Sequence, residues 1–280
     1  MARYNDDRLT EMRRHFRTTE RRETMGGVPV EVVRPIGKTP ARNVSRALIN
    51  VHGGALLWGA GSGALVEAIP IAATMGVVTL DYRLAPEHRF PAASQDVATV
   101  YVALLRRVRP ENIVIYGCSA GGIGTAQTVA WLRRARVPPP GAIGTFCGTG
   151  AAYAGDSAYL VDPLTTGGRI RAGVPPDILP TVYLKGVPAS DVLAYPLRSD
   201  AVMATLPPVL QLAGGRDFAA SILTAQHRKL SALGVPSELQ IFDGLGHAFL
   251  VWPDMAESTE AYRLSADFLD RHLGVRAKSH

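Results

Sequence analysis

The chain has 280 residues, of which 47% are hydrophobic and 19% are charged, and its formal net charge is +6. This length suits one large domain or two small ones, and the composition excludes a disordered chain and a coiled coil. Two cysteines are too few for a disulfide scaffold. No uncharged apolar run reaches the roughly 18 residues that a membrane-spanning helix needs.

The positive charge comes from arginines that are scattered along the chain. The first 25 residues hold seven arginines but also five acids, a mixture typical of a solvated helix face. Because nucleic-acid-binding chains gather their basic residues in one stripe, we expect no nucleic-acid partner. We also expect no membrane insertion and a cytoplasmic location, since the N-terminus has no apolar signal-peptide core.

Apolar periodicity predicts short strands that alternate with helices. Residues 5–22 carry a narrow helical stripe formed by Leu9, Met12 and Phe16. The expected strands lie at 28–33, 47–51, 77–80, 112–116, 142–146, 207–213 and 239–242, and the expected helices at 92–107, 119–136, 221–233 and 257–273. This alternation indicates an α/β fold with a mostly parallel sheet that helices cover on both faces.

One stretch, residues 152–200, is rich in Gly, Pro and Asp and shows no clear strand–helix unit. We interpret it as an insertion that covers the carboxyl edge of the sheet, where ligands bind in such folds. The alternative is a disordered linker. The expected division is an N-terminal cap helix region (1–25), the first part of the core (26–151), the cap insertion (152–200) and the remainder of the core (201–280).

The sharpest chemical signal is the pentapeptide Gly117-Cys118-Ser119-Ala120-Gly121, which fits G-x-S-x-G. It lies between a predicted strand and a predicted helix, the context that makes this pattern a nucleophile elbow. Such a turn raises the Ser119 hydroxyl to the edge of the sheet, at the positive end of the helix. The alternative is a glycine-rich turn with no chemical role. The strand–turn–helix context favours Ser119 as a nucleophile.

A serine nucleophile needs a base, and the base needs an acid that orients it. Of the seven histidines, His247 is the best candidate base, because it follows the strand at 239–242 on a glycine-rich loop. Asp217 follows the strand at 207–213 and is the expected acid. Both residues should therefore reach the sheet edge that carries Ser119. The rival acids are Asp191, Asp200 and Asp243.

Acyl transfer also needs N–H donors for the developing oxyanion. The N–H groups of Gly53 and Gly54, directly after the strand at 47–51, and of Ala120 are the expected donors. We expect the ring of His52 to bind nearby loop backbone and shape this hole. Trp58 either lines the substrate pocket or packs against the core.

Together these motifs resemble the bacterial hormone-sensitive-lipase-like esterase family of the α/β-hydrolase fold. The family's His-Gly-Gly-Gly appears as 52–55, its Gly-Asp-Ser-Ala-Gly-Gly as 117–122, and its Asp-Tyr-Arg-Leu-Ala-Pro-Glu is unchanged at 81–87. The chain order Ser, Asp, His is also that of α/β-hydrolases. The resemblance implies about eight strands, a small cap, hydrolysis of short- or medium-chain carboxylic esters, and often homodimers.

Two positions depart from the family pattern. Ala55 replaces the third glycine of the oxyanion motif, and Cys118 replaces the aspartate before the nucleophile. Cys118, together with Cys147, suggests a redox-sensitive thiol beside the site, although a small buried residue without chemistry is the simpler interpretation.

The sequence therefore predicts a serine carboxylesterase that acts on a small-molecule ester. An amidase, a carbamate hydrolase or a lactone hydrolase with the same triad remains an alternative. A non-catalytic ligand receptor on this fold is a more distant one. We expect no metal and no cofactor, because the sequence contains neither H-E-x-x-H, C-x-x-C nor a phosphate-binding glycine loop.

Overall fold

The computed structural model describes residues 2–37, 40–150, 154–159 and 182–274. Its centre is an eight-stranded sheet in the order β1-β2-β4-β3-β5-β6-β7-β8. The strands are β1 (Thr18–Met25), β2 (Val28–Pro35), β3 (Ala47–Val51), β4 (Val77–Leu80), β5 (Ile113–Cys118), β6 (Ala142–Phe146), β7 (Val209–Gly214) and β8 (Ser237–Phe242). The β1–β2 and β2–β4 pairings are antiparallel and the others are parallel. This confirms the predicted sheet.

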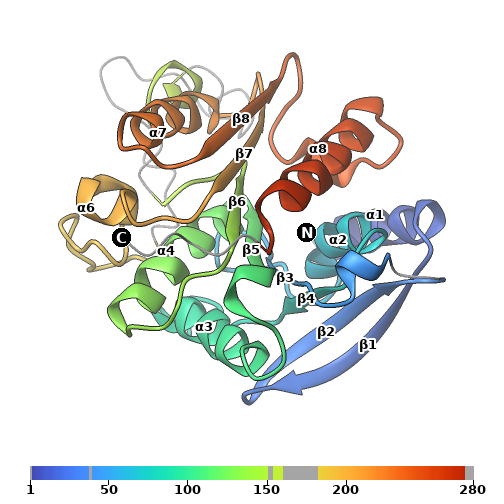
Figure 1. Ribbon diagram of the computed structural model, residues 1–280. Helices are drawn as coiled ribbons and strands as arrows, with labels where there is room; N and C mark the ends of the chain where they lie inside the picture. The colour runs from blue at the N-terminus through green and yellow to red at the C-terminus, as the bar shows by residue number, and fades with distance from the viewer. Residues whose placement is uncertain (1, 38–39, 151–153, 160–181, 275–280) are drawn as a thin grey trace.

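Helices cover both faces of the sheet (Figure 1). On one face lie α2 (Ser62–Ala72) and α8 (Ala256–His272), with α1 (Ala2–His15) packed against α2. On the other lie α3 (Ala92–Leu104), α4 (Ala120–Arg134) and α7 (Ala220–Ala232). Residues 156–159 are also helical, and the other helices are the short α6 (Asp200–Met203) and the 3-10 turns Ala41–Asn43, Pro110–Asn112, Pro196–Arg198 and Phe249–Val251.

The central strands are apolar along their whole length because both of their faces are covered. Every residue of β3, β4, β5, β6 and β7 is buried. Consecutive residues of one strand point to opposite faces of the sheet and therefore pack into different cores, as the two-residue period of a strand requires. In β3, Leu48 packs into the α2–α8 core and Ile49 into the α3–α4 core.

One predicted element was wrong, and one helix was not predicted. Residues 18–25 form strand β1 instead of continuing the N-terminal helix, which ends at His15. The backbone of β1 pairs with β2 along its whole length, and this ladder outweighs the helical spacing of Phe16. Helix α2 has no predicted counterpart, because it is buried over most of its surface and shows no polar stripe.

The predicted cap insertion lies mostly outside the described residues, since 151–153 and 160–181 are not among them. Where the chain is described again, Tyr183 is fully buried and its hydroxyl accepts a hydrogen bond from the Ala93 N–H at 3.2 Å. The division into cap and core therefore stays a prediction.

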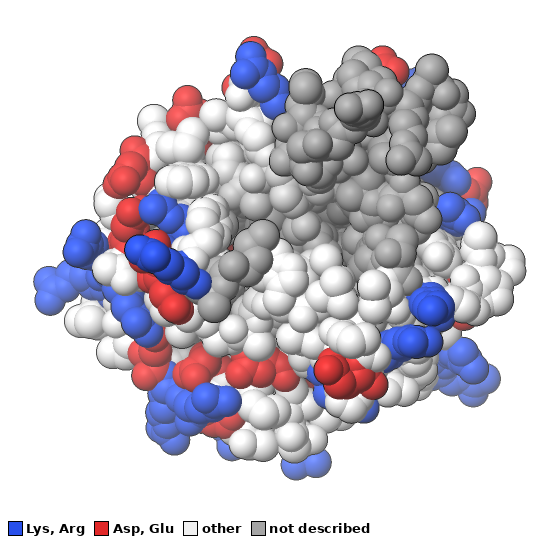
Figure 2. Space-filling model, turned by 180° about the vertical axis from the view of Figure 1, so that it is seen from behind, with Lys and Arg blue, Asp and Glu red and all other residues white. Residues whose placement is uncertain are grey.

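The surface carries charges of both signs. Figure 2 shows Lys and Arg side chains beside Asp and Glu side chains around the rim of the face in view. Ion pairs between described residues include Arg13 with Glu20 and Arg271 with Glu238. No helix in the described part of the chain is long and apolar enough to cross a membrane.

Candidate active site

Ser119 lies on a sharp turn between β5, which ends at Cys118, and α4, which begins at Ala120. Its backbone angles are φ 57° and ψ −124°, a conformation that a residue with a side chain rarely adopts. The turn is tight on both sides: a Cβ atom on Gly117 or Gly121 would lie 2.2 or 1.9 Å from the carbonyl oxygen of Val51. The predicted elbow is therefore present, with Ser119 at its tip.

The structure brings Ser119, His247 and Asp217 into one hydrogen-bonded chain. His247 Nε2 lies 2.9 Å from Ser119 Oγ, and His247 Nδ1 lies 3.0 Å from both carboxyl oxygens of Asp217. Because a carboxylate only accepts hydrogen bonds, Nδ1 carries the proton and Nε2 is the acceptor that faces the serine hydroxyl. This is the arrangement that a serine nucleophile and its base require.

Asp217 and His247 reach this edge because they follow the neighbouring strands β7 and β8. Asp217 is fully buried and accepts a hydrogen bond from the Ala219 N–H at 2.8 Å. The two loops interlock closely, since a Cβ atom on Gly214 would lie 2.0 Å from the carbonyl oxygen of Leu245. Backbone contacts therefore fix the positions of the acid and the base.

The rival acids lie elsewhere. Asp243 is exposed, and Asp191 accepts hydrogen bonds from the N–H groups of Leu193 and Ala194. Asp200 forms an ion pair with Lys229. None of the three has a described contact with His247.

Phe218 is a neighbour of the site that the sequence argument missed. Its ring stacks on the imidazole of His247, with 4.2 Å between ring centroids and 24° between planes. Its position directly after Asp217 gave no signal, because one aromatic residue after a strand is common. The stacking limits rotation of the His247 ring about its side-chain bonds.

His52 is fully buried at the start of the oxyanion loop. Its Nδ1 donates to the Gly53 carbonyl at 2.7 Å, and its ring stacks on Tyr82 at 4.2 Å. The Tyr82 hydroxyl donates to the His52 carbonyl at 2.7 Å. Burial lowers the pKa of His52 to about 4, so the ring is neutral near pH 7. The expected contact of this ring with loop backbone is present.

The three predicted oxyanion donors differ in their surroundings. The Gly53 N–H donates to Glu67 Oε1 at 2.7 Å, so this donor has a partner inside the protein. The N–H groups of Gly54 and Ala120 donate to no other residue in the described part of the chain. Trp58 is 38% exposed, and a Cβ atom on Gly54 would lie 2.1 Å from its carbonyl oxygen.

The two cysteines are buried, free and close to the site. The hydrogen bond with Cys118, together with burial, raises the pKa of Cys147 well above its ordinary value. Cys147, Asp217 and His247 each offer one ligand atom within 4.8 Å of the others, the one such group of metal-ligating side chains among the described residues. Two of these three side chains, Asp217 and His247, already form the hydrogen bonds that lead to Ser119. The redox hypothesis for Cys118 stays a prediction.

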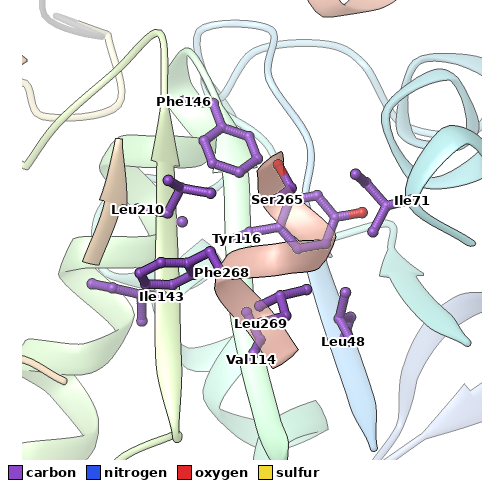
Figure 3. Close-up of a pocket in the computed structure, with 11 residues that line it drawn as sticks. Leu48, Ile71, Val114, Tyr116, Ile143, Phe146, Leu210, Ser265, Phe268 and Leu269 are labelled. Carbon is purple, nitrogen blue, oxygen red and sulfur yellow. The ribbon is translucent and has the colours of Figure 1, made fainter. Parts of the chain in front are cut away.

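A separate apolar pocket lies between α8 and the sheet (Figure 3). It is lined by side chains of α8, of α2 and of four central strands, among them Leu48, Tyr116 and Phe268. Neither Ser119, Asp217 nor His247 lines it. Almost all of its lining is apolar, so we interpret it as a packing gap of the core rather than a place of catalysis.

Comparison with known proteins identifies the family. The family model described as "alpha/beta hydrolase fold" matches residues 48–251. The chain belongs to the α/β-hydrolase family.

Relatives of this hydrolase are esterases and acetyl-hydrolases. The esterase LipU of Mycobacterium tuberculosis is 28% identical over 263 residues, which cover 87% of this chain and 84% of LipU. An acetyl-hydrolase of Streptomyces hygroscopicus is 29% identical over 269 residues, which cover 91% of this chain and 84% of that protein.

Solved structures agree. The esterase E25 superposes with a TM-score of 0.84 at 28% identity, covering 98% of this chain and 84% of E25. An esterase of the bacterial hormone-sensitive lipase family gives a TM-score of 0.81 at 26% identity, covering 96% of this chain and 92% of that esterase. The predicted family is confirmed, and the hydrolase is a carboxylesterase-like enzyme.

Proposed function

We propose that this hydrolase cleaves carboxylic esters with short or medium acyl chains, with Ser119 as nucleophile, His247 as base and Asp217 as the acid that orients the base. The observation that carries the proposal is the hydrogen-bonded chain from Ser119 Oγ through His247 to Asp217. The names of the relatives support ester hydrolysis but leave the acyl chain of this enzyme's substrate open.

The reaction follows from the positions of the protons. His247 Nε2 takes the proton of Ser119 as Oγ attacks the ester carbonyl, and the buried carboxylate of Asp217 stabilises the imidazolium. The N–H groups of Gly54 and Ala120 receive the oxyanion, since both are free of partners among the described residues. The alcohol leaves with the proton from His247. Water then repeats the sequence on the acyl-enzyme.

The test is hydrolysis of p-nitrophenyl esters from acetate to decanoate by wild type and by Ser119→Ala. Wild type should show its highest kcat/KM at a short or medium chain. Ser119→Ala should lose at least about 10³-fold in kcat while its circular dichroism spectrum stays unchanged. Full activity in this variant would refute the role of Ser119.

A matched pair of histidine variants tests the base. His247→Asn should lose activity as Ser119→Ala does, whereas His88→Asn should keep it, because His88 is exposed in a loop. Amide, carbamate and lactone analogues belong in the same assay. A preference for one of them over esters would leave the proposed roles of the triad in place but change the proposed substrate class. Stoichiometric binding without turnover would favour a non-catalytic receptor.

A further inference from the structure

Glu67 is an acidic residue inside an otherwise apolar helix. Its neighbours in α2, among them Val66, Ala68 and Ile69, are buried in the core. Together with Ile71, Tyr116 and Cys118, Glu67 lines a small apolar pocket. Glu67 itself is partly buried, and two of these neighbours, Ile71 and Tyr116, also line the pocket of Figure 3. An acid in such a place needs an explanation.

The two oxygens of this carboxyl group contact different parts of the site. Oε1 accepts the hydrogen bond from the Gly53 N–H at 2.7 Å, in the oxyanion loop. Oε2 accepts from the Cys118 N–H at 3.4 Å, in the residue directly before the nucleophile, and from Asn50 Nδ2 at 3.3 Å. Asn50 is fixed in turn, since its Oδ1 accepts from the Thr79 hydroxyl at 2.8 Å. One carboxyl group thus joins the oxyanion loop to the nucleophile elbow.

The charge state of Glu67 depends on opposing effects. Removal of water raises its pKa to about 7, while the hydrogen bonds from Gly53, Asn50 and Cys118 and the proximity of His247 oppose part of this rise. The other titratable groups that act on it electrostatically are the Tyr82 and Tyr116 hydroxyls and the Cys118 thiol. All the groups hydrogen-bonded to its carboxyl oxygens are donors, and donors favour the carboxylate.

The sequence departs from the family pattern at the same place. The family motif has an aspartate at position 118, and here the side chain of Cys118 lines the same small pocket as Glu67. We propose that Glu67 is a positioning residue that supplies, from helix α2, the carboxyl group that Cys118 lacks, and that it holds the oxyanion loop at a fixed distance from Ser119. This inference rests on the proposed serine mechanism.

The effect on the reaction follows from distance. The N–H of Gly54 belongs to the residue after Gly53, and the N–H of Ala120 lies two residues after Cys118. These two donors, the ones of the three predicted that do not themselves bond to Glu67, are thus one or two residues away from a bond to it. An oxyanion donor acts only when it lies close to the position of the transition-state oxygen, and a misplacement of about 1 Å can cost 10²-fold in rate. Loss of the bonds from Glu67 should therefore lower kcat more than it changes KM.

The experiment relocates the carboxyl group. Glu67→Leu should lower kcat by about 10- to 100-fold with KM within about twofold of wild type. Glu67→Gln, which keeps the shape, should show a smaller loss in kcat. The double variant Glu67→Leu/Cys118→Asp should recover most of the lost kcat, whereas Cys118→Asp alone should not exceed wild type, because two acids would then share one pocket. Glu260→Gln, on the exposed part of α8, is the matched control.

Two further readouts separate positioning from mere packing. The pH profile of kcat should lose one ionisation in Glu67→Gln, and the loss should not occur in Glu260→Gln. Amide hydrogen exchange at 53–54 and 118–120 should become faster in Glu67→Leu and slow again in the double variant, and this measurement needs no turnover.

The outcomes are distinguishable. An unchanged kcat and pH profile in Glu67→Gln, or a folded double variant that recovers neither kcat nor slow exchange, would overturn the role of Glu67. A wild type without Ser119-dependent hydrolysis would instead remove the proposed function, and the exchange measurement would still decide whether Glu67 holds the loop.

Discussion

His52 and Glu67 should respond to pH in opposite directions. An unfolded chain protonates His52 below about pH 6.5, but the folded protein resists this proton until about pH 4, so stability is lost as the pH falls through that range. Glu67 has its folded pKa raised from 4.5 to about 7. The contribution of Glu67 to the free energy of unfolding is fully present below about pH 4.5 and is lost as the pH rises through about 7.

This opposition gives a prediction for stability. The free energy of unfolding of wild type, relative to Glu67→Gln, should fall as the pH rises from 5 to 8, by up to roughly 3 kcal/mol. Glutamine removes the proton exchange but keeps the size of the side chain. Urea unfolding at the two pH values measures the difference. A gap between the two proteins that stays constant with pH would contradict the raised pKa of Glu67.

A second prediction concerns His52. Replacement of His52 by phenylalanine retains a ring that can stack on Tyr82 but cannot take up a proton. The variant should be less stable than wild type at pH 7, because its ring no longer donates to the Gly53 carbonyl. Between pH 6.5 and 4 it should lose less stability than wild type does, by about 3 kcal/mol at most. Equal losses in both proteins over this interval would show that His52 does not govern acid stability.

At the residue scale, sequence patterns singled out Ser119, Asp217 and His247, which the structure joins by hydrogen bonds, because each follows a predicted strand in a glycine-rich context. They did not locate Glu67 or Phe218. A single acid in an apolar helix has no motif, and its partners Gly53 and Cys118 lie 14 and 51 residues away along the chain. Such a contact appears only when the chain is folded.

At the scale of elements, the turn after β7 depends on close contact with the loop after β8. Gly214→Ala should lower stability by about 1–3 kcal/mol, since its Cβ atom would lie 2.0 Å from the Leu245 carbonyl oxygen. It should also lower kcat, because Asp217 is on the same turn. Thermal unfolding and ester hydrolysis measure the two effects.

The control for this prediction is in the neighbouring loop. A Cβ atom on Gly246 would meet nothing within 4 Å. Gly246→Ala should therefore change stability by less than about 0.5 kcal/mol, although Gly246 precedes His247 directly. Equal losses in the two variants would mean that the close contact at Gly214 is not what fixes the turn.

The same physics explains which elements the sequence predicted. Strands β3, β4 and β6 have the predicted bounds, because short apolar runs buried on both faces have few alternatives. Strand β1 was missed since Thr18–Met25 is mostly polar and pairs with only one neighbour. Helix α2 was missed because an apolar helix that contains Pro70 shows no helical period in its polar residues.

At the scale of the molecule, the mixture of positive and negative surface charges should weaken binding of a polyanion, despite the net charge of +6. Figure 2 shows basic and acidic side chains on the same face, so a polyanion would meet both signs there. We therefore expect binding to duplex DNA weaker than about 10⁻⁵ M at physiological salt. Fluorescence polarisation of labelled DNA measures it. Micromolar binding that declines steeply with added salt would point to a basic surface that this view leaves out.

The edge strand β1 has a consequence for how the molecules behave when crowded. As the outermost strand, it presents backbone groups that could template a strand from another molecule, which is a common start of aggregation. Its centre, however, is Glu20-Arg21-Arg22-Glu23, and Arg13 holds Glu20 through two hydrogen bonds. An incoming strand would have to strip water from four adjacent charges before it could form its own ladder. This edge of the sheet therefore resists edge-to-edge growth even when the protein is concentrated.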